Sequence, residues 1–478
     1  MASAYRPRAR ADVLYACSAC ATTSPRWVGR CPSCGEWNSF APARAAGLDR
    51  SGVGAPAAVV LRDVSTDAAR PMPTLVPELD RVMAGGVVQG SVTLLFGPPG
   101  IGKSTLLFHV LAALASDGVD VMLASAEESL AQVRGRAGRI GQVPAHLLAL
   151  EGPDVDAIEA AVERHRPALV VVDSLQSVSD PALPQPAGSL AQVRACVERL
   201  TRMAKSTGVP LLLVGHVTKD GDPAGPRAVE HLVDTVLSFD GDRHHALRVL
   251  TSVKHRFGPT GEVGIFEMRD DGLRAVPDPG PLMLGDRMAG VPGSVVVPVL
   301  QGRRPLLVEV QALLGTGAAS SSRPTCLGID GARANLLVAV LACRTGVEIP
   351  TGADFFVAAV GGITVTEPAA DLALALAMAS VVDGRAVPAD AVAFGELGLA
   401  GEVRAVAGAD RRLAEARRAG FRRAFVPASV ADVAPPGMVV HGVRTLAEAL
   451  VSVREGAEAP EARGTMPEWS TVPAAASH

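Results

Sequence analysis

The stretch from Ser91 to Leu107, SVTLLFGPPGIGKSTLL, decides the fold. Its apolar run predicts a buried strand, and apolar residues at helical spacing follow the loop. Between them stands a match to the phosphate-loop pattern G-x-x-x-x-G-K-[ST], whose backbone N–H groups and helix N-terminus cradle phosphates. We therefore expect a nucleoside triphosphate to bind at Gly97, Pro98, Pro99, Gly100, Ile101, Gly102, Lys103, Ser104 and Thr105. Lys103 is expected to reach the β- and γ-phosphates, and the Ser104 hydroxyl to ligate Mg²⁺.

The composition favours an α/β fold with aliphatic cores. Hydrophobic residues make up 48% of the 478-residue chain, but aromatic residues only 3%. The net charge of −4 gives no global attraction to nucleic acid, so such binding needs local basic clusters. Because we find no membrane-length apolar run and no signal-peptide core, we expect a cytoplasmic protein without a membrane partner.

Four of the seven cysteines form two C-x-x-C pairs, Cys17 with Cys20 and Cys31 with Cys34. This spacing predicts a tetrahedral Zn²⁺ site, closed by four thiolates and therefore structural. Four free buried thiols would need a core that this small polar stretch does not supply. The other three cysteines stand alone in apolar helical contexts and are expected in cores, namely Cys196, Cys326 and Cys343.

The chain is expected to divide into five segments. The cysteine pairs fall in residues 12–38, and the Ala-, Gly- and Pro-rich residues 39–57 predict a linker. Residues 58–280 alternate strand and helix signals as a parallel sheet requires. A second block at 285–455 has Ala-rich helices between short strands, and 456–478 predict a disordered tail. The predicted elements are strands at 92–96, 119–125, 168–173 and 209–215 and helices at 189–207, 372–382 and 410–419.

Acidic residues follow the predicted strands at the edge where ligands of open parallel sheets gather. Asp173 fits the carboxylate that holds the Mg²⁺ shell, although an aspartate here also suits a helix N-cap. Glu127 and Glu128 close the second strand, where one of them would orient and deprotonate the attacking water. Both also suit a solvated helix start. His216 ends the fourth strand and would sense the γ-phosphate, unless it is a structural histidine.

Two further motifs carry a resemblance to a known family. Residues 215–221 read GHVTKDG, followed by AGPRAVEH, and residues 254–258 read KHRFG. Together with the cysteine pairs and the phosphate loop, they make the chain similar to the RadA (Sms) family of bacterial recombination and repair ATPases along nearly its whole length. The resemblance implies an N-terminal zinc finger, a RecA-like ATPase core and a C-terminal Lon-protease-like domain, which here reads VGGITVTEPAADLALALAM and FGELGLAGEVRAV.

By this resemblance the chain is a hexameric DNA-dependent ATPase that drives branch migration of recombination intermediates. Its cofactors would be ATP, Mg²⁺ and Zn²⁺, and its partners single-stranded and branched DNA and a RecA-type recombinase. The rival interpretation is an ATP-gated scaffold or adaptor that moves no strand. The implied catalytic residues are Lys103, Glu127 (rather than Glu128), Lys254 and Arg256, and ATP contacts extend to Asp173 and His216.

The KHRFG motif departs from the family pattern K-N-R-F-G at His255, so a hydrogen bond specific to the asparagine is not carried over. In RecA-like rings, cations at the positions of Lys254 and Arg256 reach the γ-phosphate of a neighbouring subunit. From the residues alone, a solvent-facing cluster at a strand end fits the motif equally well.

The C-terminal block departs from active Lon-type proteases, which use a serine activated by a lysine. Residues 366–370, TEPAA, hold no serine, and the last lysine of the chain is Lys254. We therefore expect a ring-forming scaffold and DNA-binding surface rather than a protease. Loops at 179–188 and 217–226 are further candidates for DNA contact. The expected phosphate contacts are Lys219, Arg227, Arg303, Arg304 and Arg323.

Overall fold

The computed structural model describes residues 15–17, 22–24, 26–42, 60–63, 65–216, 228–241, 247–316, 324–361 and 363–458. The chain forms two compact units, Met1–Asp67 and Ala68–His478. Strands and helices alternate through most of the second unit, which confirms the predicted α/β class. Among the helices in these ranges, none is long and apolar enough to cross a membrane.

The first unit is built around a small antiparallel sheet. Its strands are β1 (Tyr15–Cys17), β2 (Thr23–Ser24) and β3 (Phe40–Pro42), in the order β2-β1-β3. Cys17 pairs with Phe40 across the sheet, and Cys17 and Cys31 are both buried. The sheet therefore extends to Pro42, into the segment that the sequence assigns to the linker.

The second unit begins with a nine-stranded sheet in the order β14-β13-β12-β11-β6-β10-β9-β7-β8. The strands β6 to β11 run parallel to one another, and β12 to β14 are antiparallel. Their bounds are β6 Val92–Gly97, β7 Val121–Ser125, β8 Leu147–Glu151, β9 Leu169–Asp173, β10 Leu211–His216, β11 Thr235–Asp240, β12 Leu247–His255, β13 Val263–Arg269 and β14 Gly272–Ala275. The sequence prediction does not include the edge strand β8, whose apolar run is short and whose residues are half-buried or exposed.

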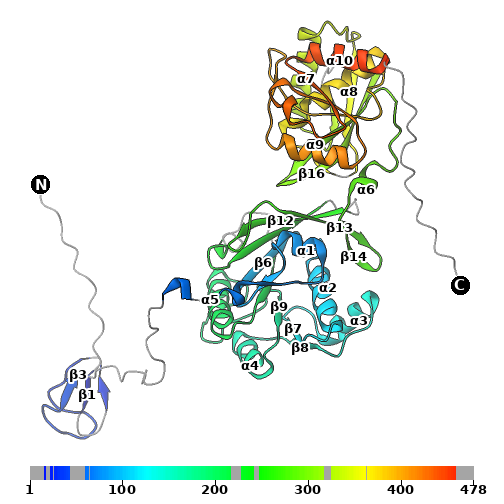
Figure 1. Cartoon of the computed structure of the whole chain (residues 1–478). Helices are drawn as coiled ribbons and strands as arrows, with labels where there is room; N and C mark the ends of the chain where they lie inside the picture. The colour runs from blue at the N-terminus through cyan, green and yellow to red at the C-terminus, as the bar shows by residue number, and fades with distance from the viewer. Residues whose placement is uncertain are drawn as a thin grey trace, which may run out of the picture. The chain divides into compact units, whose positions relative to one another are not determined.

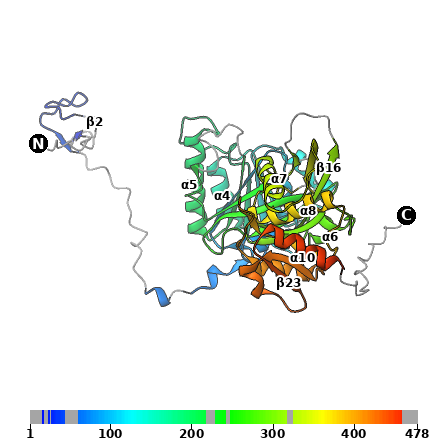
Figure 2. The same cartoon turned by 90° about the horizontal axis from the view of Figure 1, so that it is seen from above.

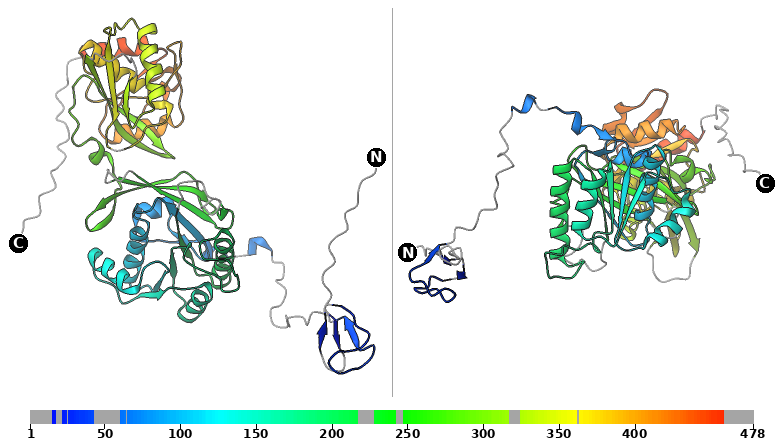
Figure 3. Two further views of the ribbon diagram at one scale, coloured as in Figure 1. Left: turned by 180° about the vertical axis from the view of Figure 1, so that it is seen from behind. Right: turned by 90° about the horizontal axis from the view of Figure 1, so that it is seen from below.

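Helices cover both faces of this sheet (Figures 1 and 3). On one face lie α1 (Pro77–Val82), α2 (Lys103–Ser116) and α3 (Leu130–Ile140), and on the other α4 (Val155–His165) and α5 (Leu190–Thr207). Successive side chains of a strand point to opposite faces of the sheet. Val171 therefore packs in the core on the side of α1, α2 and α3, and Val172 in the core on the side of α4 and α5. Coverage on both faces explains why these strands read as unbroken apolar runs.

The register of the parallel strands brings their carboxyl ends to one edge. His216 of β10 pairs with Gly97 of β6, and Ser125 of β7 pairs with Asp173 of β9. Beyond Ser125, the backbone N–H of Ala126 donates to the Asp173 carbonyl at 2.8 Å. The phosphate loop and the residues that follow β7, β9 and β10 therefore share this edge.

A seven-stranded sheet in the order β17-β18-β16-β15-β19-β22-β23 organises the C-terminal block. Its helix α8 (Asp371–Asp383) is buried from Asp371 to Ser380 and packs on β16, α7 and α10 (Figure 2). The strands are β15 Ser294–Gln301, β16 Arg304–Thr316, β17 Thr325–Leu327, β18 Ala353–Ala359, β19 Ala391–Ala393, β22 Arg423–Pro427 and β23 Val439–Val443. The other helices are α6 Gly280–Leu284, α7 Gly331–Arg344, α9 Ala409–Arg418 and α10 Leu446–Glu458. Two short antiparallel pairs complete the unit, β4 (Pro71–Met72) with β5 (Val87–Val88) and β20 (Glu396–Leu397) with β21 (Val403–Arg404).

The isolated cysteines are only partly where the sequence predicts them. Cys196 is buried in α5, as expected. Cys326 is half-buried on the edge strand β17 and packs against the C-terminal core. The prediction is wrong for Cys343, which is exposed in the last turn of α7. One side of this helix faces away from the core, and an apolar neighbourhood in the sequence does not show which side that is.

Candidate nucleotide and metal sites

The phosphate loop connects β6 to α2 and depends on two glycines. A Cβ atom on Gly97 would lie 2.2 Å from the Phe239 carbonyl oxygen, and one on Gly102 would lie 2.7 Å from the Met268 methyl group. Gly102 also has a φ of 111°, where other residues are strained. No described side chain caps the N-terminus of α2. Its first N–H groups are therefore available to an anion.

Lys103 is buried at the start of α2, with its ammonium group turned onto the loop. Its Nζ donates hydrogen bonds to the carbonyl oxygens of Gly97 at 2.8 Å and Pro98 at 3.0 Å. Burial lowers the pKa of Lys103, while the carboxylates of Asp173 and Glu127 raise it. A phosphate oxygen in the loop would be a stronger partner for this cation than either neutral carbonyl.

Asp173, at the end of β9, lies beside the side chain of Ser104, which lowers the pKa of its carboxyl group. Burial raises the pKa of Asp173, and nearby Glu127 and Glu128 push it further in the same direction. Hydroxyl and carboxylate oxygens are the ligands that Mg²⁺ prefers, and a divalent cation would relieve the repulsion between these acids. The two residues predicted to hold Mg²⁺ therefore lie together, in a site whose chemistry fits the ion.

The two adjacent glutamates after β7 have different surroundings. Glu128 forms an ion pair with Arg136 of α3 at 2.9 Å. Glu127 instead turns toward the neighbouring strands, where its Oε1 lies 3.2 Å from the Nε2 atom of His216. The predicted γ-phosphate sensor and the predicted base are thus in contact with each other.

Glu127 also has partners that motif reasoning did not find. Its Oε1 accepts a hydrogen bond from the Ser174 hydroxyl and a longer one, at 3.4 Å, from Ser177. Both serines follow Asp173 in the loop after β9. The only signal in the sequence is that a serine comes directly after the strand-ending aspartate.

Lys254 and Arg256 lie near the amino ends of the parallel strands, opposite the carboxyl ends where the phosphate loop lies. Thr235 of β11 pairs with His255 on one side and with Thr93 of β6 on the other. Thr93 is four residues before Gly97, and four residues of a strand span roughly 13 Å. The level of His255 and the start of the phosphate loop are therefore separated by this distance along β6. The two cations are therefore remote from the phosphate loop of their own chain.

The KHRFG motif is tied to the residues just before β11. The Lys254 Nζ donates to the carbonyl oxygens of Glu230 and Val233, both at 2.7 Å. Burial lowers the pKa of Lys254, and the neighbouring Arg256 adds to this effect. Arg256 is 56% exposed and lies 3.3 Å from the buried carboxylate of Asp234.

His255, which replaces the family asparagine, is buried within the sheet. Its Nδ1 lies 2.9 Å from the Thr235 hydroxyl, and its ring meets that of Phe257 edge to face. Burial lowers the pKa of His255. A polar contact therefore persists at this position, although its partner is a residue of the adjacent strand.

The predicted DNA-binding residues fall into three groups. Arg303 is 55% exposed and pairs with Glu262 at 3.2 Å. Arg304 forms an ion pair with the buried Glu78, and it also donates to the Val263 and Pro277 carbonyls. The Arg304 side chain is only 10% exposed and is therefore engaged within the chain. Lys219, Arg227 and Arg323 lie outside the described residues.

Of the two loops proposed for DNA contact, residues 217–226 also lie outside the described part of the chain. The other loop, 179–188, is fastened to α5. The Gln192 amide donates to three of its carbonyl groups, and Arg199 pairs with Asp180 at 3.0 Å. These contacts fix the loop against α5.

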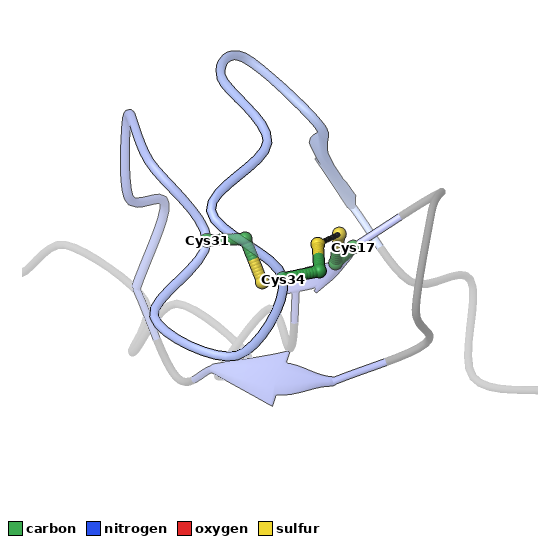
Figure 4. A group of neighbouring side chains, drawn as sticks. All are labelled: Cys17, Cys31 and Cys34. Atoms are coloured by element: carbon green, nitrogen blue, oxygen red, sulfur yellow. Dashed lines mark hydrogen bonds between the residues drawn. The ribbon is translucent and has the colours of Figure 1, made fainter.

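In the first unit, three of the four predicted zinc ligands gather (Figure 4). The sulfur atoms of Cys17, Cys31 and Cys34 all lie within 4.8 Å of one another. Those of Cys17 and Cys34 are 3.7 Å apart. Two thiolates on one tetrahedral Zn²⁺ are separated by roughly 3.8 Å, given a Zn–S bond of about 2.3 Å. The spacing therefore fits zinc, and Cys20 lies outside the described residues.

Comparison with known protein families matches three segments of the chain. Residues 15–42 match a rubredoxin metal binding domain, which covers the cysteine cluster. Residues 56–222 match an AAA domain, and residues 361–430 match subunit ChlI of Mg-chelatase. The matches follow the order of parts that the sequence predicts.

Whole-length relatives decide the family. The DNA repair protein RadA of Mycobacterium tuberculosis is 46% identical over 92% of this chain and 93% of its own length. RadA of Bacillus subtilis is 42% identical over 91% of this chain and 97% of its own, and RadA of Pseudomonas aeruginosa 42% over 94% and 100%. The chain belongs to the RadA family. Its fold is accordingly a RecA-like phosphate-loop core between an N-terminal cysteine cluster and a C-terminal Lon-like domain.

Proposed function

We propose that this RadA-family chain is a DNA-dependent ATPase that processes branched recombination intermediates during DNA repair. The observation that carries the proposal is the convergence at one sheet edge of an uncapped phosphate loop, a buried lysine and three carboxylates. The relatives named above are DNA repair proteins, which supports DNA as the partner.

In this proposal the loop N–H groups and Lys103 bind the β- and γ-phosphates of ATP. Ser104 and Asp173 would hold Mg²⁺, which supplies positive charge to the phosphate oxygens as charge develops on them. Glu127 orients the attacking water and takes its proton, since it is the half-exposed acid that faces the loop edge. His216 adjoins Glu127 and would link the base to the state of the γ-phosphate.

We further propose that Lys254 and Arg256 act on the nucleotide of a neighbouring subunit in a homo-hexamer. The support is their distance from their own phosphate loop together with the exposure of Arg256. A cation supplied from the next subunit stabilises transition-state charge and makes hydrolysis depend on assembly. If the Arg256 side chain moves to the neighbouring nucleotide, it loses its ion pair with Asp234 and gains one with a phosphate.

Mixing two inactive variants tests the function and this arrangement. Arg256→Ala should bind ATP normally but lose DNA-stimulated hydrolysis by on the order of a thousandfold. Mixed with Lys103→Ala subunits, it should recover activity, because some interfaces then join an intact phosphate loop to an intact arginine. Co-assembled rings that stay inactive would indicate that Arg256 acts within its own subunit or on DNA.

The alternative, an ATP-gated scaffold for a RecA-type recombinase, predicts assembly that depends on nucleotide but no strand movement. A branch-migration assay on synthetic forks separates the two functions. Unwinding that requires hydrolysis and single-stranded DNA supports the proposal. Normal DNA-stimulated hydrolysis without any strand displacement would favour the scaffold.

We propose that the cysteine cluster binds one structural Zn²⁺ through Cys17, Cys20, Cys31 and Cys34. Support comes from the three gathered sulfur atoms and from the match to a metal binding domain. The purified protein should contain about one zinc per chain, and a Cys31→Ser, Cys34→Ser double variant should lose it. Folded wild-type protein that contains no metal would contradict the assignment.

A further inference from the structure

The carboxylate of Glu127 is held by one oxygen only. Its Oε1 receives the Ser174 hydroxyl, and Ser177 and His216 lie at 3.4 and 3.2 Å from the same atom. For Oε2, the described part of the chain provides no hydrogen bond or ion pair. One oxygen is thus anchored while the other is left open to solvent.

The anchor at Ser174 is itself fixed. This residue is fully buried, whereas the side chain of Glu127 is 42% exposed. The next backbone N–H, that of Leu175, donates to Val214 of β10 at 2.9 Å, and the Ser174 carbonyl accepts from Ser177 at 3.1 Å. Rotation about the side-chain bonds is therefore the main freedom left to the hydroxyl.

We propose that Ser174 is a positioning residue that holds Glu127 with Oε2 facing the attacking water. The inference rests on the proposed ATPase function. A half-exposed glutamate samples many rotamers, and a general base acts only when it lies within hydrogen-bond reach of the proton it takes. A buried donor directly after β9, the strand next to β7, removes most of that freedom, and its position beside Asp173 links the base to the proposed Mg²⁺ site.

Ser174 is a better anchor than the other two contacts. Ser177 is only partly buried, and its hydroxyl reaches Glu127 only at the limit of hydrogen bonding. The His216 ring is partly exposed, and either of its nitrogens donates or accepts according to tautomer. Of the three contacts, the Ser174 hydroxyl is the one on a fully buried residue, and it acts as a donor to the carboxylate.

Steady-state hydrolysis and ATP binding, measured separately on full-length variants, test the role. Ser174→Ala should lower kcat by about 10- to 100-fold, the range that misplacement of a catalytic group produces. Its KM and its affinity for a fluorescent ATP analogue should stay within about twofold of wild type, a margin set well below that kcat loss. As a control, Ser252→Ala also removes a buried serine hydroxyl from the same sheet, and kcat should not change. Ser174→Thr keeps the hydroxyl and should restore most of kcat.

A double-mutant cycle excludes a merely structural role. In a Glu127→Gln background, Ser174→Ala should cause no further loss, because the anchor acts through the carboxylate alone. Independent, multiplying losses would overturn the inference, as would a Ser174→Ala kcat within twofold of wild type. The cycle remains decisive if the added methyl of threonine prevents folding. Wild-type protein that does not hydrolyse ATP would instead refute the proposed function itself.

Discussion

Two groups of carboxylates in the second unit differ in their partners. After the strands of the first sheet, Glu127 has an oxygen without a partner among the described residues, and Asp173 faces other acids. Before α8, Glu367 accepts two hydrogen bonds of 2.7 Å from the guanidinium of Arg412, one on each oxygen. The first group is undersupplied with donors, and the second is saturated.

The same saturation surrounds Asp371, the first residue of α8. Arg333 donates to both of its oxygens, and the Leu397 N–H donates to one of them at 3.0 Å. Burial raises the pKa of both Asp371 and Asp173. The guanidinium of Arg333 and the Leu397 N–H oppose the shift at Asp371, and Ser104 and Arg136 oppose it at Asp173. A carboxylate with all its hydrogen bonds made is part of the structure, whereas one with open positions is available for chemistry.

The saturated carboxylates lie next to the stretch where a Lon-type protease would carry its nucleophile. The residues just before α8, where a protease would carry its nucleophile, include the buried Ala369 and Ala370, and the ion pairs of Arg333 and Arg412 flank them. Residues 366–370 hold neither a serine nor a lysine, so a Ser–Lys dyad of the Lon type is not expected at this position. Its charged groups stabilise the start of α8 instead.

The largest expected effect concerns the undersupplied edge. Lys103→Ala removes the main cation of the phosphate loop and should reduce ATP hydrolysis by about a thousandfold, the upper range for loss of one electrostatic stabiliser. Its free energy of unfolding should change little, because the hydrogen bonds of Lys103 to two loop carbonyls are offset by the cost of burying its charge, which also lowers its pKa. Hydrolysis assays and urea titrations give the two quantities. Full turnover would contradict the assigned site.

The matched change at the saturated site should have the opposite profile. Arg412→Met leaves Glu367 without its partner and removes a fully buried guanidinium, which should cost about 3 kcal/mol of unfolding free energy. Hydrolysis per folded molecule should remain near wild type. Arg417→Met changes an exposed arginine of the same helix and is the control. Equal stability of the two variants would show that the ion pair is not structural.

Most residues of the candidate site could be predicted from local sequence motifs. The phosphate loop, Asp173 and the cysteine pairs follow from spacing alone, since each packs its chemistry into a few consecutive residues. Contacts between distant residues did not follow. Arg304 pairs with Glu78, 226 residues away, and nothing near either residue indicates the partner. The Ser174 anchor likewise depends on β7 and β9 being neighbours, and that strand order was not predicted.

The smallest effect tests whether the open carboxylates carry a cost for the fold. Since burial raises the pKa of Asp173 above its ordinary value of 3.8, the folded chain binds this proton more tightly than the unfolded chain. The stability from that proton is complete below the ordinary pKa, and it is lost as pH rises through the raised pKa of the folded state.

Asp173→Asn stays neutral at every pH and so avoids this loss. Without nucleotide or Mg²⁺, the variant should gain stability over wild type as pH rises from 4.5 to 8, by about 1 kcal/mol, a typical gain when a functional charge is removed. Urea titrations at several pH values measure the difference, with hydrolysis lost throughout. A variant less stable than wild type at pH 8 would mean that Ser104 and Arg136 satisfy Asp173 as fully as Arg412 satisfies Glu367. Asp173 would then not belong to a group of carboxylates that lack hydrogen-bond donors, and the distinction between the two groups would not hold.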